Sequence, residues 1–363
     1  MIINYQRITG LIEMDLDTLR EEIRQKDLEI ARLISERTEL TKKVGDYKVA
    51  NGIPIRNKEV ESKVIGRYVE LGSGYGLSPM TMSIVASALI KEAVSQESRL
   101  IRADDPKKVA IIGGAGKMGK WMSDMLSSAG HEVSVIDPAV KNGLTIKDCS
   151  SSDIVIVSVP IHAVNDTLVQ LDDICRKDTL IFDISSLKTS AVGTLRKMAK
   201  TRKVCSVHPM FGPSAESLYD RNVIVCDCGN PQAVEEAKAL FDDRGGDIRI
   251  MEVEEHDSYM SYVLGLTHAV NIALFTVLQR SGYDFADLLT VSSTTFSKGL
   301  DTNMSVASED PRLYYEIQHM NGYREKMWSL FSGAVEDLKK ASLDDDPSDF
   351  IRIMDAGKRY FQR

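Results

Sequence analysis

Three glycines in the middle of the chain have the spacing of a phosphate-binding turn. Gly114, Gly116 and Gly119 follow the apolar segment Val109–Ile112 and precede a stretch typical of a helix. In this pattern the first glycine permits the tight turn, the second lets the backbone approach a pyrophosphate, and the third lets the helix pack on the strand. Lys117 and Met118 open that helix, whose N-terminus would stabilise phosphate charge. The pattern predicts a dinucleotide site.

A carboxylate follows the second expected strand. Asp137 comes directly after residues 132–136, about twenty residues beyond the glycines, where a carboxylate accepts hydrogen bonds from ribose hydroxyls. The same charge repels a 2′-phosphate, and the next basic residue is Lys141. These features favour NAD over NADP. The alternative is a sheet of the same type that binds no cofactor.

A histidine between two strands is a candidate proton acceptor. His208 lies in Ser206–Pro213, after an expected strand at the carboxyl edge of the sheet, where open α/β sheets bind ligands. There it would take the proton of a substrate hydroxyl as hydride leaves the neighbouring carbon. The alternative is a capping histidine held by the two prolines. Ser186, within Asp183–Lys188, has a small hydroxyl that would line the nicotinamide.

The first hundred residues contain a different set of charges. Arg37 interrupts the apolar seam of a long predicted helix, and a seam arginine is costly unless it pairs with an anion. Lys48, eleven residues later, shares its face, whereas Arg20, seventeen residues earlier, points roughly a quarter-turn away and would reach a partner chain. The alternative, a solvated basic helix, does not explain Arg37. The seam consists of Leu16, Leu19, Ile23, Ile30, Leu33, Leu40, Val44 and Tyr47.

These residues require a multidomain chain. Residues 1–14 have no assigned role. Residues 15–101 form an all-α unit of three predicted helices, at 15–50, about 57–71 and about 79–101. Gly72–Gly76 is expected to break the second helix, and Ser78 is expected to cap the third, with Pro79 as its first residue. A linker at 102–106 leads to an α/β Rossmann-type doubly wound sheet at 107–254. An all-α unit then occupies 255–363.

The strands and later helices follow from the apolar periodicity. The expected strands are 108–112, 132–136, 153–159, 179–184, 203–207, 222–226 and 247–252. The expected C-terminal helices are 255–281, 284–299, 310–341 and 347–361.

Composition narrows the class of protein. The net charge of −8 argues against nucleic acid or an anionic membrane as partner. No apolar run is expected to reach the length of a membrane span, and residues 1–14 lack the pattern of a secretory signal. Five cysteines without a CxxC pair predict reduced thiols, a cytoplasmic location and no metal site.

Residues 108–320 resemble the prephenate dehydrogenases. The matching segments are Val109–Gly119, Ser158–His162, Asp183–Lys188, His208–Pro213, Glu255–Asp257, Ser292–Ser293 and Asp310–Pro311. The resemblance implies that His208 binds the ring hydroxyl of prephenate and assists hydride transfer to NAD, with Ser186 beside it. It also implies that Val159 and Pro160 border the cofactor, that His268 binds substrate, and that the last helices form a homodimer. From its sequence alone, His268 in Val263–Val270 reads as a core histidine.

The resemblance fails at one place. Where the family has arginines against a substrate carboxylate, this chain has Ser297 and Ser305. Lys298 is expected to bind the substrate instead, with Arg312 as the alternative. The choice between prephenate and its amino analogue arogenate therefore stays open.

Residues 15–101 resemble the all-helical chorismate mutases, which are intertwined dimers. The resemblance implies that Arg20 (crossing from the partner), Arg37 and Lys48 bind the chorismate dianion, and that Glu61 binds its hydroxyl. Three further residues differ from the common family types: Asn57, Val60 and Ala93. Asn57 is expected to contact the substrate. Glu97 would act on the breaking ether oxygen together with Lys48, and only when protonated.

The resulting prediction is a bifunctional enzyme of tyrosine biosynthesis. Chorismate would be rearranged to prephenate, which would be oxidatively decarboxylated with NAD to 4-hydroxyphenylpyruvate. One alternative is a helical unit that serves only for dimerisation or regulation. Another is an unrelated β-hydroxyacid dehydrogenase or an arogenate dehydrogenase.

Overall fold

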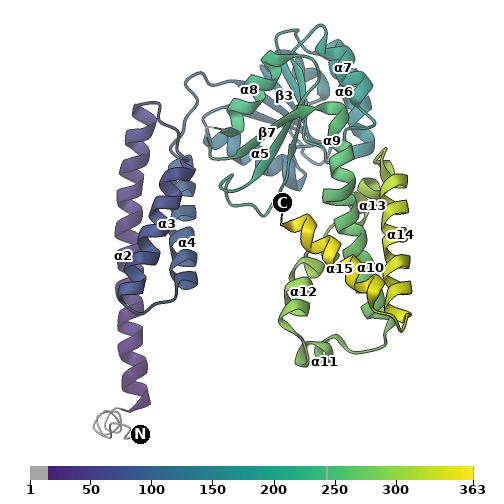
Figure 1. The fold of residues 1–363 in the computed structure, drawn as a ribbon. Coiled ribbons are helices and arrows are strands. Elements are labelled where there is room, and N and C mark those ends of the chain that lie inside the picture. The colour runs from purple at the N-terminus through teal and green to yellow at the C-terminus, as the bar shows by residue number, and fades with distance from the viewer. Residues whose placement is uncertain (1–14, 243, 363) are drawn as a thin grey trace, which may run out of the picture.

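The chain folds into three units. The computed structural model describes residues 15–242 and 244–362. Figure 1 shows an N-terminal helical unit beside an α/β unit, with a second helical unit on the other side. The expected multidomain architecture is therefore confirmed.

The N-terminal unit contains three helices: α2 (Leu16–Ala50), α3 (Lys58–Gly74) and α4 (Pro79–Ser98). Ser78 caps α4 by accepting a hydrogen bond from the Thr81 amide, and Pro79 is the first helical residue, as predicted. Helix α3 ends at Gly74, within the expected break at Gly72–Gly76 but three residues beyond residue 71. Gly72 is buried inside the helix, and a Cβ there would lie 2.3 Å from Cγ of Met82. Gly72 thus permits close packing of α3 on α4.

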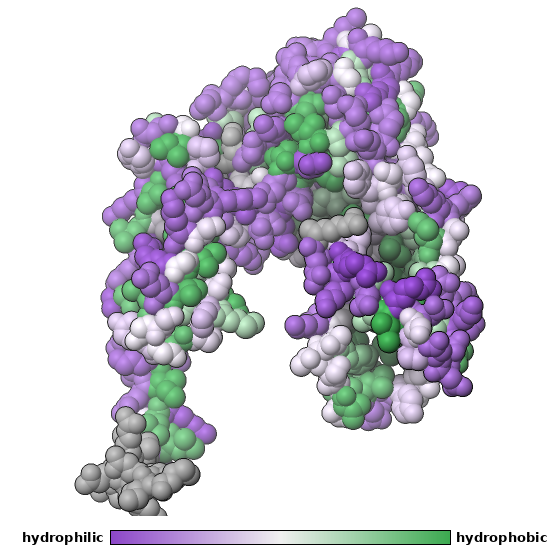
Figure 2. All heavy atoms as spheres, viewed as in Figure 1, coloured by the Kyte–Doolittle hydropathy of each residue, from purple (hydrophilic) through white to green (hydrophobic). Residues whose placement is uncertain are grey.

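Helix α2 leaves much of its apolar seam uncovered. Its N-terminal half projects beyond α3 and α4 (Figure 1), and hydrophobic residues are visible on it in Figure 2. Exposed apolar side chains on this helix are Leu16, Ile23, Leu28, Ile30, Leu33, Ile34, Leu40, Val44, Tyr47 and Val49. A single helix with such a face requires an apolar partner surface.

The α/β unit is built on a seven-stranded sheet of order β2-β1-β3-β4-β5-β6-β7. The strands are β1 (Lys108–Ile112), β2 (Glu132–Ile136), β3 (Ile154–Val157), β4 (Leu180–Asp183), β5 (Val204–Pro209), β6 (Asn222–Asp227) and β7 (Asp247–Glu252). All neighbours are parallel except β5 and β6, where His208 pairs with Ile224. Residues 210–221 return the chain between these strands without a crossover helix, so the pair is antiparallel.

Helices cover both faces of the sheet. They are α5 (Lys117–Ser128), α6 (Ile161–Ile174), α7 (Val192–Ala199) and α8 (Pro231–Asp242), with a short 3₁₀ helix at Ile146–Ser151. One buried cluster joins the sheet to α6 and α7, and another joins its other face to α5 and α8. The strand order reverses between β1 and β3, so the crevice outside their carboxyl ends is the expected ligand site.

The C-terminal unit is helical. Its helices are α9 (Val253–Met260), a π-helical segment (Ser261–Leu266), α10 (Thr267–Arg280), α11 (Phe285–Thr290), α12 (Thr294–Ala307), α13 (Pro311–Met320), α14 (Arg324–Leu343) and α15 (Ser348–Phe361). Two expected helices are each divided into two. Ser293 starts α12 by capping the Phe296 amide, and Asn321 donates to the Asp257 carbonyl while accepting from the Tyr323 amide. These polar side chains end one helix and start the next.

One expectation about apolar runs is wrong. Val253–Arg280 forms a 28-residue helix with a mean hydropathy of 1.6, which is long and apolar enough to cross a membrane. Only 22% of its most apolar window is buried within the chain. The part of this helix that the chain leaves uncovered is an apolar surface of the kind that packs against another protein.

Candidate functional site

The crevice between β1 and β3 contains a cavity of about 800 Å³. Its lining includes four residues expected to touch the cofactor: Gly116, Asp137, Val159 and Pro160. It also includes residues that were not singled out for this role, namely Gly113, Thr145, Ser158 and His162. Met118 instead packs against the buried face of the sheet, and Lys117 is exposed in the first turn of α5.

The tight turn of this crevice belongs to Gly113 rather than Gly114. Gly113 has φ of +77°, and a Cβ there would lie 2.3 Å from the Ser158 carbonyl oxygen. Gly114 lies close to another strand, because its Cβ would be 2.8 Å from Cγ1 of Val135. Gly119 has the predicted role, since its Cβ would be 2.5 Å from the Gly113 carbonyl oxygen. The adjacent pair of glycines in the sequence concealed which of them adopts positive φ.

Asp137 ties the end of β2 to the glycine turn. Its carboxylate accepts hydrogen bonds from the amides of Ala115, at 3.1 Å, and Ala139, at 2.9 Å. A carboxylate has about four acceptor positions, so this one retains capacity for two ribose hydroxyls. Asp137 is therefore fixed in orientation at the edge of the cavity.

His208 begins a buried chain of hydrogen bonds. Its Nδ1 lies 3.0 Å from Nε2 of His256, whose Nδ1 lies 2.6 Å from Oδ1 of Asp257. Asp257 also accepts from the hydroxyl of Thr189 and from the backbone amides of Lys188 and Thr189. Only 4% of His208 is exposed, and His256 is fully buried.

These hydrogen bonds determine which nitrogen of each imidazole, His208 and His256, carries a proton. Burial alone would raise the pKa of Asp257, but hydrogen bonds from His256, Thr189 and the backbone hold it below its usual value. Asp257 is therefore an acceptor, so His256 Nδ1 carries a proton and its Nε2 accepts from Nδ1 of His208. Nε2 of His208 is left with a free lone pair. Burial, followed by the nearby His256 and Lys188, lowers the pKa of His208 well below its usual value, which keeps the ring neutral.

A buried ion pair fixes the strand ends beside His208. Lys188 Nζ lies 2.8 Å from Oδ2 of Asp183, and both side chains are fully buried. The same ammonium donates to the carbonyl oxygens of Ser185 and Val207. Because Val207 precedes His208, Lys188 connects the segment after β4 to the end of β5. Ser186 is half-buried in that segment, at the same edge of the sheet.

The helical unit contributes further groups. Glu316 on α13 accepts the Ile161 amide at the start of α6 and pairs with His162, which lines the cofactor cavity. His268 on α10 is 92% buried, stacks on Tyr314 with ring centroids 4.1 Å apart, and has an Nδ1 without a partner among the described residues. Burial lowers the pKa of His268 to about 4, so its ring is neutral.

The two cations expected to bind substrate in this unit, Lys298 and Arg312, do not contact the histidines of the site within the part of one chain that the structure describes. Lys298 is exposed on α12, which is joined to α10 by a hydrogen bond from Asn303 to the Asn271 carbonyl. Arg312 is exposed in the first turn of α13. Neither has a described contact with His208 or His268.

In the N-terminal unit, two of the expected groups meet directly. Lys48 Nζ lies 2.7 Å from Oε2 of Glu97, whose side chain is 5% exposed, and also donates to the Ile55 carbonyl. Gly45 makes this contact possible, because a Cβ there would lie 2.9 Å from Cγ of Glu97. Arg37 lies half-buried on the same helix and donates to the Leu89 carbonyl of α4.

The other three residues expected to bind substrate in this unit, Asn57, Glu61 and Arg20, make no hydrogen bond or ion pair with Lys48 or Glu97 in the described structure. Asn57 caps α3 by accepting hydrogen bonds from the amides of Glu59 and Val60, a role that asparagine and aspartate fill equally well. Glu61 is bound by Arg56 and by Tyr219 of the α/β unit. Arg20 is exposed, pairs with Asp17, and lies about 25 Å along the helix from Arg37, too far to serve the same chain's site.

The roles of several site residues were not predicted from the sequence. The Glu255–Asp257 segment was recognised only as a motif, without the hydrogen bond from His256 to His208. Arg56, Tyr219 and Glu316 were not singled out, because their contacts join residues 5, 158 and 154 positions apart in the chain, mostly across unit boundaries.

The chain matches three family models. Residues 19–98 match chorismate mutase type II, residues 118–250 match the nucleotide-binding domain of prephenate dehydrogenase, and residues 252–356 match its dimerization domain. Together these matches cover all three units seen in the structure.

Individual relatives agree with the family models. The chain is 27% identical to the T-protein of Enterobacter agglomerans over 310 residues, which is 84% of this chain and 81% of that protein. It is 28% identical to the T-protein of Haemophilus influenzae over 309 residues, covering 83% and 80%. A segment of 58 residues is 45% identical to the intracellular chorismate mutase of Mycobacterium bovis, covering 16% of this chain and 55% of that protein.

Solved structures share the fold of the second and third units. The prephenate dehydrogenase of A. aeolicus, crystallised with hydroxyphenyl propionate and NAD+, aligns with a TM-score of 0.57 at 21% identity, over 72% of this chain and 99% of that one. The arogenate dehydrogenase of Synechocystis aligns with a TM-score of 0.55 at 16% identity, over 70% and 99%. The chain thus belongs to the bifunctional family in which a type II chorismate mutase is joined to an NAD-dependent prephenate dehydrogenase.

Proposed function

We propose that the two halves catalyse consecutive reactions at separate sites, with the residue roles given below. The N-terminal unit rearranges chorismate to prephenate. The other two units oxidise and decarboxylate prephenate to 4-hydroxyphenylpyruvate. The observation that carries the second assignment is the hydrogen-bond chain from Asp257 through His256 to His208, because it presents a neutral proton acceptor at the carboxyl edge of the sheet.

The dehydrogenase step needs a base that is neutral before reaction. Nε2 of His208 would accept the proton of the substrate's ring hydroxyl, and the imidazolium so formed would be stabilised through His256 by Asp257. NAD, when bound, supplies the hydride acceptor. Loss of hydride and proton turns the hydroxyl into a carbonyl. Departure of carbon dioxide leaves its bonding electrons to the ring, which becomes aromatic as the carbonyl oxygen takes a proton back from His208. Ser186 would orient the same hydroxyl from the end of β4.

The cavity between β1 and β3 suits NAD. Gly113, Gly116 and the first turn of α5 would hold the pyrophosphate, since the turn approaches closely and the helix N-terminus favours anions. Asp137 would accept from the ribose hydroxyls and disfavour a 2′-phosphate. Val159 and Pro160 would border the nicotinamide half of the cavity.

The mutase step requires positioning and charge stabilisation rather than a nucleophile. Arg37 and Lys48 would bind the two negative groups of chorismate, and Arg20 would come from the partner chain. Lys48 and Glu97, 2.7 Å apart, would both face the breaking ether oxygen. Glu97 contributes a hydrogen bond there only in its protonated form.

A homodimer would cover the two exposed apolar faces. The seam of α2 and the apolar helix Val253–Arg280 both lack sufficient cover within one chain. An intertwined pair of α2 helices would also carry Arg20 into the partner's site. We propose a cytoplasmic location, supported by five free, buried cysteines, among which burial raises the pKa of Cys175 to about 11.

Two assays on the wild type test the assignment. Consumption of chorismate without NAD reports the mutase, and formation of NADH from added prephenate reports the dehydrogenase. We expect both activities. A chain that oxidises prephenate but leaves chorismate unchanged would make the N-terminal unit a dimerisation or regulatory module.

Arogenate is the second candidate for the oxidised substrate. Ser297 and Ser305 occupy α12 where the family has arginines against a substrate carboxylate, so the cation that binds this carboxylate differs here. Lys298 is the proposed replacement. The ratio of kcat/KM for prephenate to that for arogenate, in the wild type and in Lys298→Ala, decides this preference.

A further inference from the structure

The mutase and dehydrogenase halves meet around one arginine. Arg56, in the loop between α2 and α3, has a side chain that is only 12% exposed. Its guanidinium lies 2.8 Å from Asp247 at the start of β7 and 3.3 Å from Asp220. It also lies 4.7 Å from the ring centroid of Tyr219, within the range of a cation–π contact. Arg56 is therefore held mainly by the dehydrogenase half.

Arg56 and Tyr219 meet on a mutase residue. Arg56 Nε lies 3.3 Å from Oε1 of Glu61, and the Tyr219 hydroxyl donates to Oε2 of Glu61 at 3.4 Å. Tyr219 also packs on the small apolar cluster of the N-terminal unit. That cluster contains Ile55, Ile90 and Val94. Tyr219, a residue of the dehydrogenase half, thus packs against the mutase half and binds one of its residues.

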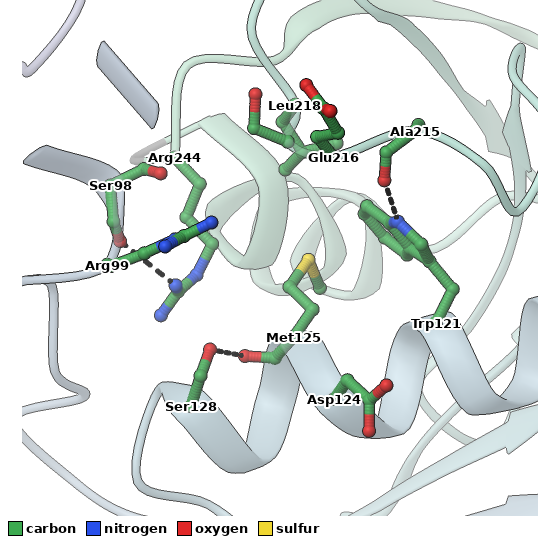
Figure 3. Close-up of a pocket in the computed structure, with 11 residues that line it drawn as sticks. Ser98, Arg99, Trp121, Asp124, Met125, Ser128, Ala215, Glu216, Leu218 and Arg244 are labelled. Carbon is green, nitrogen blue, oxygen red and sulfur yellow. Dashed lines mark hydrogen bonds between the residues drawn. The ribbon is translucent and has the colours of Figure 1, made fainter. Parts of the chain in front are cut away.

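The loop that carries Tyr219 is fixed at several points. It connects the end of β5, which holds His208, to the start of β6. The indole of Trp121 on α5 donates to the Ala215 carbonyl at 2.7 Å, as Figure 3 shows. Asp220 has φ of +57°, the one positive value at a non-glycine residue among residues 15–242 and 244–362. Such a conformation persists only where the surroundings enforce it.

A cavity of about 360 Å³ lies beside this loop, between α4 and α5 (Figure 3). It is bordered by Arg99, Trp121, Glu216 and Arg244, and its described lining includes none of the expected catalytic residues. The two halves are therefore not packed continuously. The contacts of Arg56 and Tyr219 lie on the part of the interface that carries Glu61.

We propose that Tyr219 is a positioning residue for the chorismate mutase reaction, contributed by the dehydrogenase half. It orients Glu61 together with Arg56. The inference rests on the proposed role of Glu61 as the group that binds the substrate hydroxyl. With each oxygen of Glu61 accepting one hydrogen bond from the protein, the carboxylate is held in one orientation and keeps acceptor positions for the substrate.

The protonation state of Tyr219 agrees with this role. Burial, followed by the charge of Glu61, raises the pKa of Tyr219 above its usual value, so the phenol keeps its proton and donates. Removal of the hydroxyl leaves Glu61 with Arg56 alone and free to rotate. Binding of the substrate hydroxyl is then weakened in the ground state and the transition state alike, which raises KM more than it lowers kcat.

The test uses the full-length chain with Tyr219→Phe and a control on the same loop. Glu216→Gln removes an exposed ion pair between Glu216 and Lys91, which also joins the two halves but does not involve Glu61. We expect Tyr219→Phe to raise KM for chorismate about fivefold with kcat changed less than twofold, as for loss of a modest hydrogen bond to a charged group. Glu216→Gln should leave both constants unchanged. Both variants should oxidise added prephenate at the wild-type rate.

A second measurement separates positioning from general damage. In a Glu61→Gln background, Tyr219→Phe should cause no further rise in KM, because the two side chains act as a unit. An unchanged or lower KM in Tyr219→Phe, an additive loss in the double variant, or an equal loss of prephenate oxidation would each overturn the proposal. Absence of mutase turnover in the wild type would instead overturn the proposed function.

Discussion

Nδ1 of His208 and Nε2 of His256 lie 3.0 Å apart inside the dehydrogenase half. The two rings come from different units: His208 lies next to the last residue of β5, whereas His256 lies on α9, the first helix of the C-terminal unit. Their hydrogen bond therefore joins the sheet to the helical unit at the proposed catalytic base. It also sets the tautomer of His208, because His256 is itself oriented by Asp257.

Replacing Asp257 by asparagine should impair oxidation of prephenate. An amide can donate to Nδ1 of His256, which would place a proton on Nε2 of His256 and reverse the tautomer of His208. We expect kcat to fall on the order of 100-fold or more, within the range that a positioned general base contributes. Initial rates of NADH formation measure this. Glu255→Gln, at the neighbouring exposed carboxylate, is the control, and an equal loss in that variant would argue against the tautomer.

The dehydrogenase should remain active in mildly acidic solution. Burial, followed by the nearby charges of His256 and Lys188, lowers the pKa of His208 well below its usual value. The neutral ring is the form that accepts a proton, so activity is present above that pKa and is lost as pH falls through it. We expect the acidic limb of kcat/KM for prephenate to lie below the ordinary pKa range of a histidine. A limb at or above the ordinary histidine value, absent from His208→Asn, would contradict this.

Gly113→Ala should lower the free energy of unfolding more than Gly130→Ala does. Gly113 and Gly130 both have positive φ, but a Cβ at Gly113 would meet the Ser158 carbonyl at 2.3 Å, whereas at Gly130 its nearest atom would be 3.8 Å away. We expect about 1 kcal/mol of lost stability for Gly130→Ala and ~3 kcal/mol or more for Gly113→Ala. Urea unfolding measures both values. Equal values would show that the turn relaxes.

Asp137→Asn should weaken the preference for NAD. The substitution removes the charge that repels a 2′-phosphate. The single side-chain oxygen of asparagine keeps the hydrogen bond from only one of the two amides, Ala115 and Ala139, that donate to the two carboxylate oxygens. We expect the ratio of kcat/KM for NAD to that for NADP to fall about tenfold, corresponding to roughly 1.4 kcal/mol. Steady-state rates with each cofactor at fixed prephenate give this ratio. An unchanged ratio would assign cofactor choice to another residue.

Glu97→Gln should make the mutase less sensitive to pH. An amide donates a hydrogen bond at any pH, whereas the carboxyl group donates only when protonated. We therefore expect the mutase turnover of the variant to change less with pH than that of the wild type. A wild-type profile as flat as that of the variant would exclude a proton on Glu97 from the reaction.

Much of the fold could be predicted because local patterns determine it. The strands at 108–112, 132–136 and 247–252 have the predicted bounds, since each is a short apolar or alternating segment with a turn at its ends. The division of the last unit could not be predicted, because the caps at Ser293 and Asn321 interrupt segments whose apolar periodicity continues on both sides. The end of α3 was predicted at residue 71 instead of Gly74, because Gly72 leaves room for Met82 of α4 and does not end its own helix.

In the candidate sites too, some features could be predicted from the sequence and others could not. Lys48 and Glu97 were predicted together and lie in contact, although 49 positions apart, because the resemblance to a known family supplied the pairing. The glycine turn was predicted one residue too late, since positive φ depends on the approach of Ser158 from β3. Tyr219 has no local signal, because its relation to Glu61 exists only once two units have packed.

We propose that one chain contains two independent sites, and complementation between two variants is the direct test of this claim. Arg37→Ala and His208→Asn are each supplied with chorismate and NAD, first separately and then mixed, while NADH is followed. We predict that each variant alone forms little NADH, that Arg37→Ala still oxidises added prephenate, and that the mixture regains NADH formation because prephenate passes through solution. A single substitution that abolishes both reactions would contradict the claim.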